Sequence, residues 1–244
     1  MFSPEQREET RRRLLSLAES DDGIAAAAIT GSEATGTGDA WSDIDLAFGI
    51  PGELSAALGR WTEILERDFG ALHHWDLPWG SSIYRVYLLP DWLEVDIAFT
   101  PAAEFGPRGP SWRTVFGDTI EVEQNAPVAR DDLVGLTWHH LLHARICIER
   151  GKPWQAEWLI SGARDHMLAL ACLRLGYPTR HAKGTDELSR DVTAPLEDAL
   201  VRSLDEVELR RALAAAVDAY RDELQRTDPD AASRIGPMLA ELVA

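Results

Sequence analysis

The sequence has few cysteines and no long hydrophobic run. Its 244 residues include two cysteines, Cys147 and Cys172, which lie in apolar, helix-like surroundings without metal-ligand spacing. Such thiols are typical of structural cysteines in a reduced compartment. No run of eighteen apolar residues occurs, because even the densest stretch, around residues 166–175, is interrupted by Arg174. The N-terminal segment is typical of a helix start and not of a signal peptide, so we expect a cytoplasmic protein without a membrane partner.

Basic residues are also scarce. Lys and Arg number 24 against 41 Asp and Glu, which gives a formal net charge of −17. Nucleic-acid binding depends on neutralising phosphates with Lys and Arg, so this balance argues against a nucleic-acid partner. An acidic cleft would instead attract a polycationic substrate. The alternative is that the charge serves only to keep the protein soluble.

The pattern along the chain predicts two domains, as its length also favours. The first part mixes helices and strands. We expect helices over residues 4–19 and 51–69, strands ending at Thr30 and Gly49 and over 72–75, 83–89 and 92–99, and a loop over 101–118. From residue 131 onward only helical patterns follow, over 131–151, 153–176, 194–226 and 230–243. The boundary therefore falls near residues 126–130, which predicts an α+β fold with domains at 1–128 and 129–244.

Two short segments place carboxylates on one face of a strand. In SDIDLAFG, Asp43 and Asp45 alternate with apolar residues, and in WLEVDIAF, about fifty residues later, Asp96 does the same. Neighbouring strands would gather the three acids into one cluster, which repels itself unless a cation lies between. All-oxygen ligation suits Mg²⁺. The alternative is a solvated strand face, although no Lys or Arg lies between Arg13 and Arg60 to pair with the first two acids.

A Gly-Ser turn supplies the second half of such a site. An apolar run from Ile24 to Thr30 stops at Gly31-Ser32, as a buried strand does when it meets a turn. Glycine lets the backbone approach a phosphate, and the hydroxyl of Ser32 with nearby backbone N–H groups can hold phosphate oxygens. Ser42 is a further candidate, with a minor role, for binding the phosphates. Together with the acids, the turn favours metal-assisted phosphoryl or nucleotidyl transfer.

The arrangement Gly31-Ser32, ten residues, Asp43-x-Asp45, with Asp96 on a later strand, resembles the nucleotidyltransferase superfamily related to DNA polymerase β. The chain looks like the antibiotic-modifying branch, the aminoglycoside and lincosamide nucleotidyltransferases, which carry a helical C-terminal domain. The resemblance implies a catalytic domain with a mixed sheet flanked by helices, and a helical domain that contacts substrate and nucleotide. Many members have Arg or another non-acidic residue where this chain has Glu33, and this extra negative charge is unfavourable beside a triphosphate unless the Glu33 side chain points away from it.

The helical half offers further candidates for the site. Glu157, Ser161 and Arg164 are spaced as a polar stripe on the helix predicted over 153–176, with Asp165 adjacent. The functional interpretation places Glu157 and Asp165 on the acceptor and Arg164 on the nucleotide phosphates. The alternative is an internal ion-pair network, for example one that joins Arg145 to Asp165. Arg180 and Lys183, in the loop that follows, could grip the triphosphate, or could simply be solvated.

Histidines and aromatic residues yield weaker expectations. His139 and His143 have a spacing that can bind zinc on a helix, but no third ligand follows, so structural or solvent-facing roles are expected. Four aromatic residues lie on or near the predicted strands, and we expect most of them in the core, with one available to floor an acceptor pocket: Trp75, Trp79, Tyr84 and Tyr87.

The function predicted is transfer of a nucleoside monophosphate, as AMP from ATP, to a hydroxyl of a small cationic acceptor such as an aminoglycoside, with release of pyrophosphate. Asp43, Asp45 and Asp96 would hold one or two Mg²⁺, and Asp96 or Glu157 would act as the base. Gly31, Ser32, Ser42, Arg164 and Lys183 would bind the nucleotide. A monomer or homodimer is expected. The alternatives are a nucleotidyltransferase that modifies a partner protein, and a catalytically silent nucleotide-binding module that regulates a partner.

Overall fold

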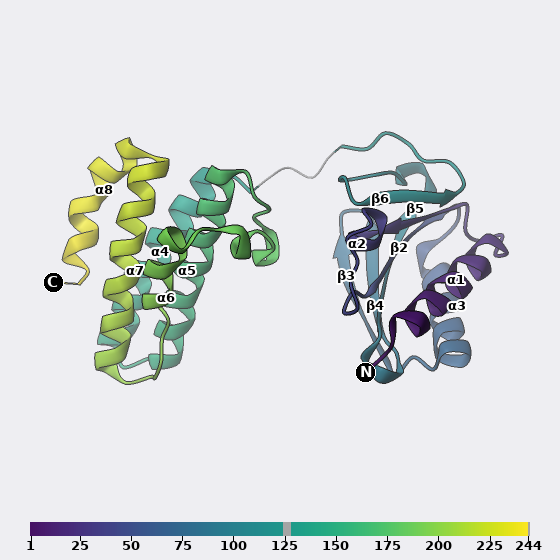
Figure 1. The fold of residues 1–244 in the computed structure, drawn as a ribbon, viewed down its shortest axis with the longest axis horizontal. Helices are drawn as coiled ribbons and strands as arrows, with labels where there is room; N and C mark the ends of the chain where they lie inside the picture. The colour runs from purple at the N-terminus through teal and green to yellow at the C-terminus, as the bar shows by residue number, and fades with distance from the viewer. Residues whose placement is uncertain (124–127, 244) are drawn as a thin grey trace. The chain divides into compact units, whose positions relative to one another are not determined.

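The computed structural model describes residues 1–123 and 128–243. The chain folds into two compact units, Met1–Asn125 and Ala126–Ala244, here called the N-terminal and C-terminal units and described separately (Figure 1). The first is a mixed sheet with helices and the second is helical, so the predicted α+β class is confirmed. The predicted boundary region, 126–130, includes residues 126 and 127, which lie outside the described ranges.

The N-terminal unit is built on one six-stranded sheet. Its strands are β1 (Ala26–Thr30), β2 (Ile44–Ile50), β3 (His73–Trp79), β4 (Ser82–Leu88), β5 (Glu94–Pro101) and β6 (Trp112–Phe116). They lie in the order β3-β4-β5-β2-β1-β6. β2 and β5 run parallel, whereas the other neighbours are antiparallel. The predicted mixed sheet is therefore confirmed, with its single parallel pair at the centre.

Two helices cover one face of this sheet, as Figure 1 shows: α1 (Pro4–Glu19) and α3 (Leu54–Phe69). Ser3 and Gln6 form the capping box that starts α1. Trp61 of α3 is fully buried and packs against Phe48 of β2 with ring centroids 4.7 Å apart. Alternate residues of the central strands, such as Leu46 and Ile97, complete this core. The strands therefore have one fully apolar face, which fixes their register.

Several local predictions in the first unit differ from the structure. β3 continues to Trp79, beyond the predicted 72–75. The strand predicted over 92–99 begins at Glu94, because Pro90–Trp92 forms a short 3-10 turn with Asp91 and Trp92 at positive φ. The stretch 101–118 is not only a loop: it contains β6, which pairs with β1. Pairing with a distant strand overrides the local Pro and Gly content, and a local pattern carries no sign of it.

The C-terminal unit contains helices α4 (Arg130–Glu149), α5 (Pro153–Leu175), α6 (Arg190–Asp198), α7 (Glu206–Thr227) and α8 (Pro229–Glu241). The helix predicted over 194–226 is in fact two helices, α6 and α7. The chain is non-helical from about residue 199 to 205. In this stretch the Arg202 backbone N–H donates to the Glu208 carboxylate at 2.9 Å, and the Ser203 hydroxyl donates to the Asp205 carboxylate at 2.8 Å. These local bonds start α7 anew. No helix within the described ranges is long and apolar enough to cross a membrane.

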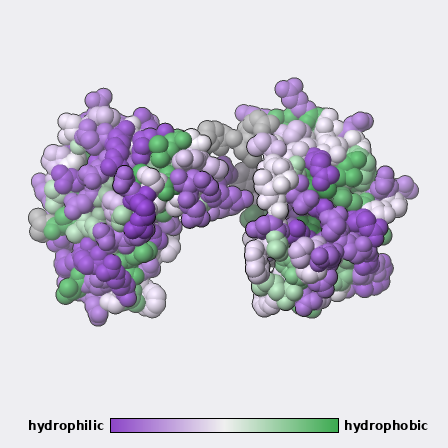
Figure 2. Space-filling model, in the orientation of Figure 1, coloured by the Kyte–Doolittle hydropathy of each residue, from purple (hydrophilic) through white to green (hydrophobic). Residues whose placement is uncertain are grey.

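Charged residues dominate the surface, and one charged pair is buried in the helical unit. Figure 2 shows hydrophilic residues over much of the visible face of each unit, in keeping with the strongly charged sequence. Glu223 of α7 is only 5% exposed. The Arg174 guanidinium of α5 donates two hydrogen bonds to its carboxylate at 2.8 and 2.9 Å, and the Thr227 hydroxyl, which donates to the Glu223 carbonyl oxygen at 2.8 Å, lies 3.1 Å from the same carboxylate. A buried carboxylate needs such partners to be tolerated.

Replacing Arg174 by Leu should destabilise the protein by up to about 3–5 kcal/mol, because it leaves the buried Glu223 carboxylate with only the longer contact to Arg226, at 3.8 Å, as its cation. Chemical denaturation followed by circular dichroism measures the loss. The double variant Arg174→Leu with Glu223→Leu should recover most of it, since the uncompensated charge is then gone. Equal stability of the single and the double variant would contradict the assignment of this loss to an uncompensated buried charge.

Candidate functional site

The site is built on the central parallel pair of strands. The register opposes Asp45 of β2 directly to Asp96 of β5. Both residues point to the face of the sheet that α1 and α3 leave uncovered, because their neighbours Ile44, Leu46 and Ile97 belong to the helix-covered core. The predicted approach of these two strands, fifty residues apart in sequence, is therefore present in the structure.

Asp96 is a strongly perturbed carboxyl group on this face. Its Oδ1 atom is buried and has no hydrogen-bond partner within the described residues. Burial raises the pKa of Asp96 to about 7, and the negative charges of Asp45, Asp43 and Glu94 contribute to this rise in that order of importance. An unpartnered carboxylate oxygen that faces other carboxylates is stabilised by either a proton or a cation. A hard divalent cation such as Mg²⁺ prefers this kind of oxygen donor.

The Asp45–Asp96 pair therefore offers suitable oxygen ligands for a metal ion. The structure does not bring the third predicted ligand, Asp43, into the same group. Asp43 precedes β2 and acts on Asp96 as a nearby charge. Within the described ranges, no group of three or more His, Cys, Asp or Glu side chains is arranged so that it could hold a metal ion. Mg²⁺ usually binds through one or two carboxylates together with water and substrate phosphate. The assignment of Asp43, Asp45 and Asp96 to the metal stays a prediction.

The Gly-Ser turn lies directly against Asp45. Gly31 and Ser32 open α2 (Gly31–Ala34), a four-residue helix in place of the loop expected there. Gly31 has φ +63°, and a Cβ atom at this position would stand 1.9 Å from Asp45 Oδ2. Glycine is thus required twice, by backbone conformation and by close approach. The Ser32 hydroxyl donates to the Ser42 hydroxyl at 3.3 Å, which brings both predicted serines to the turn.

Helix α1 supplies basic residues that sequence reasoning missed. Arg11 forms an ion pair with Glu33 at 2.8 Å, so the acidic residue after the turn is held by a cation from α1. Arg7 donates to the carbonyl oxygens of Asp39 and Ser42, the latter at 2.9 Å. The two arginines therefore tie the segment between β1 and β2 to α1. Spacing within this segment could not reveal them, because they precede it by about twenty residues or more.

The predicted stripe on α5 forms a connected set of polar contacts. The Ser161 hydroxyl donates to Glu157 Oε1 at 2.7 Å, and Arg164 contacts Ser161 at 3.5 Å and Asp165 at 3.2 Å. Arg145 pairs with Glu149, not with Asp165 as the internal-network alternative suggested. The contacts of the stripe thus join residues of α5 to one another. The roles of Glu157 and Arg164 in catalysis and nucleotide binding stay predictions.

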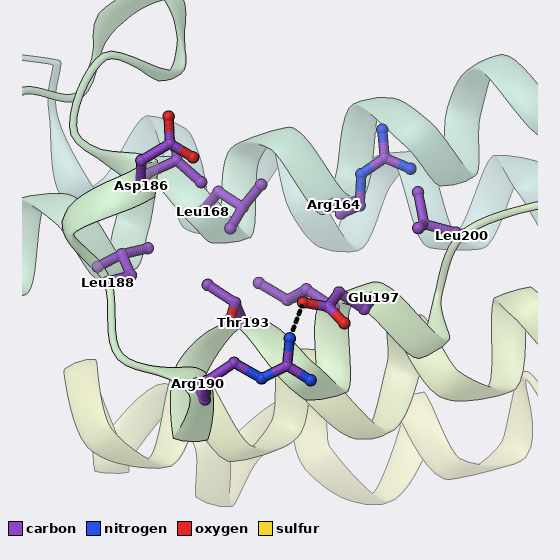
Figure 3. Close-up of a pocket in the computed structure, with 10 residues that line it drawn as sticks. Arg164, Leu168, Asp186, Leu188, Arg190, Thr193, Glu197 and Leu200 are labelled. Atoms are coloured by element: carbon purple, nitrogen blue, oxygen red, sulfur yellow. Dashed lines mark hydrogen bonds and ion pairs between the residues drawn. The ribbon is translucent and has the colours of Figure 1, made fainter.

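Arg164 also lines a cavity of about 410 Å³ inside the C-terminal unit. Figure 3 shows Arg164 and Leu168 on α5 and, on a neighbouring segment, Arg190 and Glu197, which form an ion pair at 2.8 Å. Lys183 follows the short 3-10 turn Arg180–Ala182, is exposed, and does not line this cavity. Its predicted contact with a nucleotide stays a prediction as well.

Several histidine and aromatic positions differ from expectation. Tyr87 is fully buried as expected, but Trp75 and Trp79 are 52% and 44% exposed on the edge strand β3. His140 and His166, which sequence reasoning did not single out, stack with ring centroids 4.9 Å apart, and both Nδ1 atoms are buried without a partner in the described residues. Burial lowers the pKa of each. The contact between these two histidines depends on the packing of α4 on α5, which residue spacing within either helix does not predict.

Comparison with known proteins adds little. No protein-family model matches the chain, and no curated protein matches it. Among solved structures, the chain is similar to the crystal structure of an aminoglycoside 6-adenyltransferase from Bacillus subtilis. The sequence identity is 11%, the TM-score is 0.41, and the match covers 99% of each chain. A likeness of this size carries no argument about activity.

Gly31→Ala should destabilise the protein by at least about 1–2 kcal/mol, because an L residue is strained at positive φ and its Cβ would displace the Asp45 carboxylate. Thermal unfolding measures the effect. Gly36→Ala is the matched control, because Gly36 also has positive φ but a Cβ added there would meet nothing within 4 Å. Equal destabilisation of the two variants would contradict a specific approach of Gly31 to Asp45.

Asp96→Asn should stabilise the cation-free protein at pH 8, by on the order of 2–4 kcal/mol. The raised pKa means that the folded state prefers protonated Asp96, so stability is lost as pH rises from about 4 through 7. Asparagine cannot ionise and escapes this loss, and the advantage should shrink as pH falls toward 4. Urea titrations at pH 4, 6 and 8 measure it. A variant that is less stable than wild type at pH 8 would contradict the account.

Proposed function

We propose that the protein is a Mg²⁺-dependent nucleotidyltransferase, which moves AMP from ATP to a hydroxyl group of a small cationic acceptor. The observation that carries the proposal is the in-register Asp45–Asp96 pair, with its unpartnered Asp96 oxygen, beside the Gly31–Ser32 turn. Paired carboxylates and a glycine turn able to approach phosphate are the two parts that metal-assisted phosphoryl chemistry needs.

The residues divide the work as follows. Asp43, Asp45 and Asp96 would hold one or two Mg²⁺, which neutralises the charge of the transferring phosphoryl group. Ser32, the Gly31 backbone and Ser42 orient the terminal phosphates. These groups lie on a rigid sheet and its adjoining turn. Their main contribution to catalysis is therefore to position the phosphates for in-line attack by the acceptor hydroxyl.

The transfer itself is a displacement at the α-phosphorus of ATP. The acceptor oxygen forms a bond to this phosphorus while the bond to the bridging oxygen breaks, and pyrophosphate leaves. The hydroxyl proton passes to a carboxylate. Asp96 either completes the metal site or, if it holds no cation, is the first candidate for this base, because its pKa is then raised to about 7. The roles that the sequence suggests for Glu157 as a base, and for Arg164 and Lys183 on the phosphates, stay predictions.

The proposed acceptor, a small polycation, is inferred from the net charge of the protein. A protein with a net charge of −17 attracts cations over a long range and repels polyanions such as nucleic acids. An aminoglycoside, which carries several ammonium groups and free hydroxyls, fits both requirements. The proposed partners are therefore a nucleoside triphosphate and a small polycation, in a cytoplasmic setting.

The experiment is pyrophosphate release with Mg-ATP and pooled aminoglycosides and lincosamides. Release that depends on an acceptor should fall at least about 100-fold in Asp45→Asn. Asp118→Asn, an exposed residue outside the site, should retain wild-type activity and controls for lost charge. No release with any pool, despite measurable Mg-ATP binding, would shift the assignment to a protein acceptor or a silent binding module. Equal release by wild type and Asp45→Asn would overturn the proposal.

A further inference from the structure

A second feature of the uncovered sheet face is a cavity of about 250 Å³ within the N-terminal unit. Its floor comes from the strands β1, β2, β4 and β5, and its roof comes from the segment between β5 and β6. The lining includes Ala47, Ala98, Tyr84, Phe105, Arg108 and Trp112. Ligand pockets for whole small molecules usually measure ~300–1,000 Å³, so this one suits one part of a larger ligand.

The cavity adjoins the carboxylate pair and the Gly-Ser turn. Ala47 and Ala98 follow Asp45 and Asp96 by two positions on the same strands, which places them on the same face about 7 Å further along. Thr30, which also lines the cavity, immediately precedes Gly31. A ligand could therefore fill the cavity with one end and reach the turn with the other, and its middle would pass the two carboxylates.

The aromatic wall of the cavity is formed before any ligand arrives. Phe105 is 1% exposed and packs on Trp112 with ring centroids 5.0 Å apart. A Cβ on Gly49 would stand 3.0 Å from the Phe105 ring, so the ring lies tightly on β2. The Trp112 indole N–H donates to the Thr114 hydroxyl at 3.0 Å. Such a fixed wall loses little side-chain freedom on binding a flat ring.

Arg108 gives the cavity its one basic side chain among the described lining residues. It is half-buried, and within the described part of the chain its guanidinium has no carboxylate or hydrogen-bond partner, which is unusual in so acidic a protein. It acts electrostatically on the Tyr84 hydroxyl, which burial and Asp96 also affect. Its N–H donors are available to acceptor atoms of a bound ring, as in the contacts of arginine with nucleobases.

We propose that this cavity binds the nucleoside of the nucleoside triphosphate, with the base against Trp112, which packs on Phe105, and its acceptor atoms toward Arg108. The triphosphate then runs to the Gly31–Ser32 turn, and the α-phosphate lies at Asp45 and Asp96. The proposal rests on the proposed function and adds to it the location of the base. It requires that the cavity contribute to affinity for the nucleoside and not for the phosphates.

Calorimetric titration of the full chain with Mg-ATP and with Mg-tripolyphosphate tests this. Trp112→Ala and Arg108→Met should each weaken Mg-ATP about 10-fold or more, because stacking and base contacts are lost, and should leave tripolyphosphate affinity unchanged. The matched controls are Trp154→Ala, an exposed tryptophan of the other unit, and Arg113→Met, an exposed arginine of β6 that does not line the cavity. Both controls should bind Mg-ATP as wild type does.

Three outcomes would overturn the inference. Wild-type affinity for Mg-ATP in Trp112→Ala and Arg108→Met would show that the base binds elsewhere, even if the transferase activity is present. Equal weakening of tripolyphosphate and ATP would assign the two residues to the phosphates. If wild type bound tripolyphosphate but gained nothing from the nucleoside of any triphosphate, the cavity would serve another ligand. A wild-type protein that binds neither probe would overturn the proposed function itself.

Discussion

Like-charge repulsion between Asp45 and Asp96 is the constraint on which the candidate site depends. The single parallel pairing in the sheet brings these carboxylates into register from segments fifty residues apart. The chain between them, α3 and the β3–β4 hairpin, is the crossover that parallel strands require. Burial then removes the solvent that would otherwise screen the charges, and one oxygen of Asp96 is left without a partner among the described residues. Such an arrangement is costly unless a proton or a cation shares it.

The two faces of the sheet divide the structural and chemical tasks. The face under α1 and α3 is packed with large apolar side chains, including Trp61, Phe48 and Phe99. The opposite face carries the acids and, beside them, small residues such as Ala47 and Ala98, which leave space. The packed face holds the strands in register, so the carboxylates on the other face cannot move apart to relieve their repulsion. The rigid packing of one face of the sheet therefore maintains the repulsion between Asp45 and Asp96 on the other face.

Much of this could be predicted from the sequence, where local periodicity was decisive. The alternation around Asp45 and Asp96 predicted both strands and their shared face, and the helix starts predicted at residues 4 and 153 are those of α1 and α5. The abrupt stop at Gly31 predicted the turn beside the acids. These features are set by neighbours in sequence, so their pattern is visible without the fold.

The features that were missed depend on distant partners. β6 forms because it can pair with β1 at the edge of the sheet. The ion pair of Arg11 with Glu33 depends on how α1 packs on the sheet. The stacking of His140 on His166 depends on the packing of two helices. The wall of Phe105 and Trp112 lies in a segment that its Pro and Gly content marked only as loop. The single helix predicted over 194–226 was wrong because α6 ends at Asp198, and the local hydrogen bonds of residues 202–208 accompany the start of a second helix, α7.

The most direct test of the central claim is divalent-cation binding at the carboxylate pair. Mn²⁺ titration followed by electron paramagnetic resonance counts ions bound to wild type, Asp45→Asn, Asp96→Asn and the exposed control Asp118→Asn. The account predicts one or two tight Mn²⁺ in wild type and in the control, weakened below pH 7 as Asp96 takes up a proton, and lost in both site variants. Equal binding by all four proteins would show that the ions merely neutralise an acidic surface, and would contradict the claim.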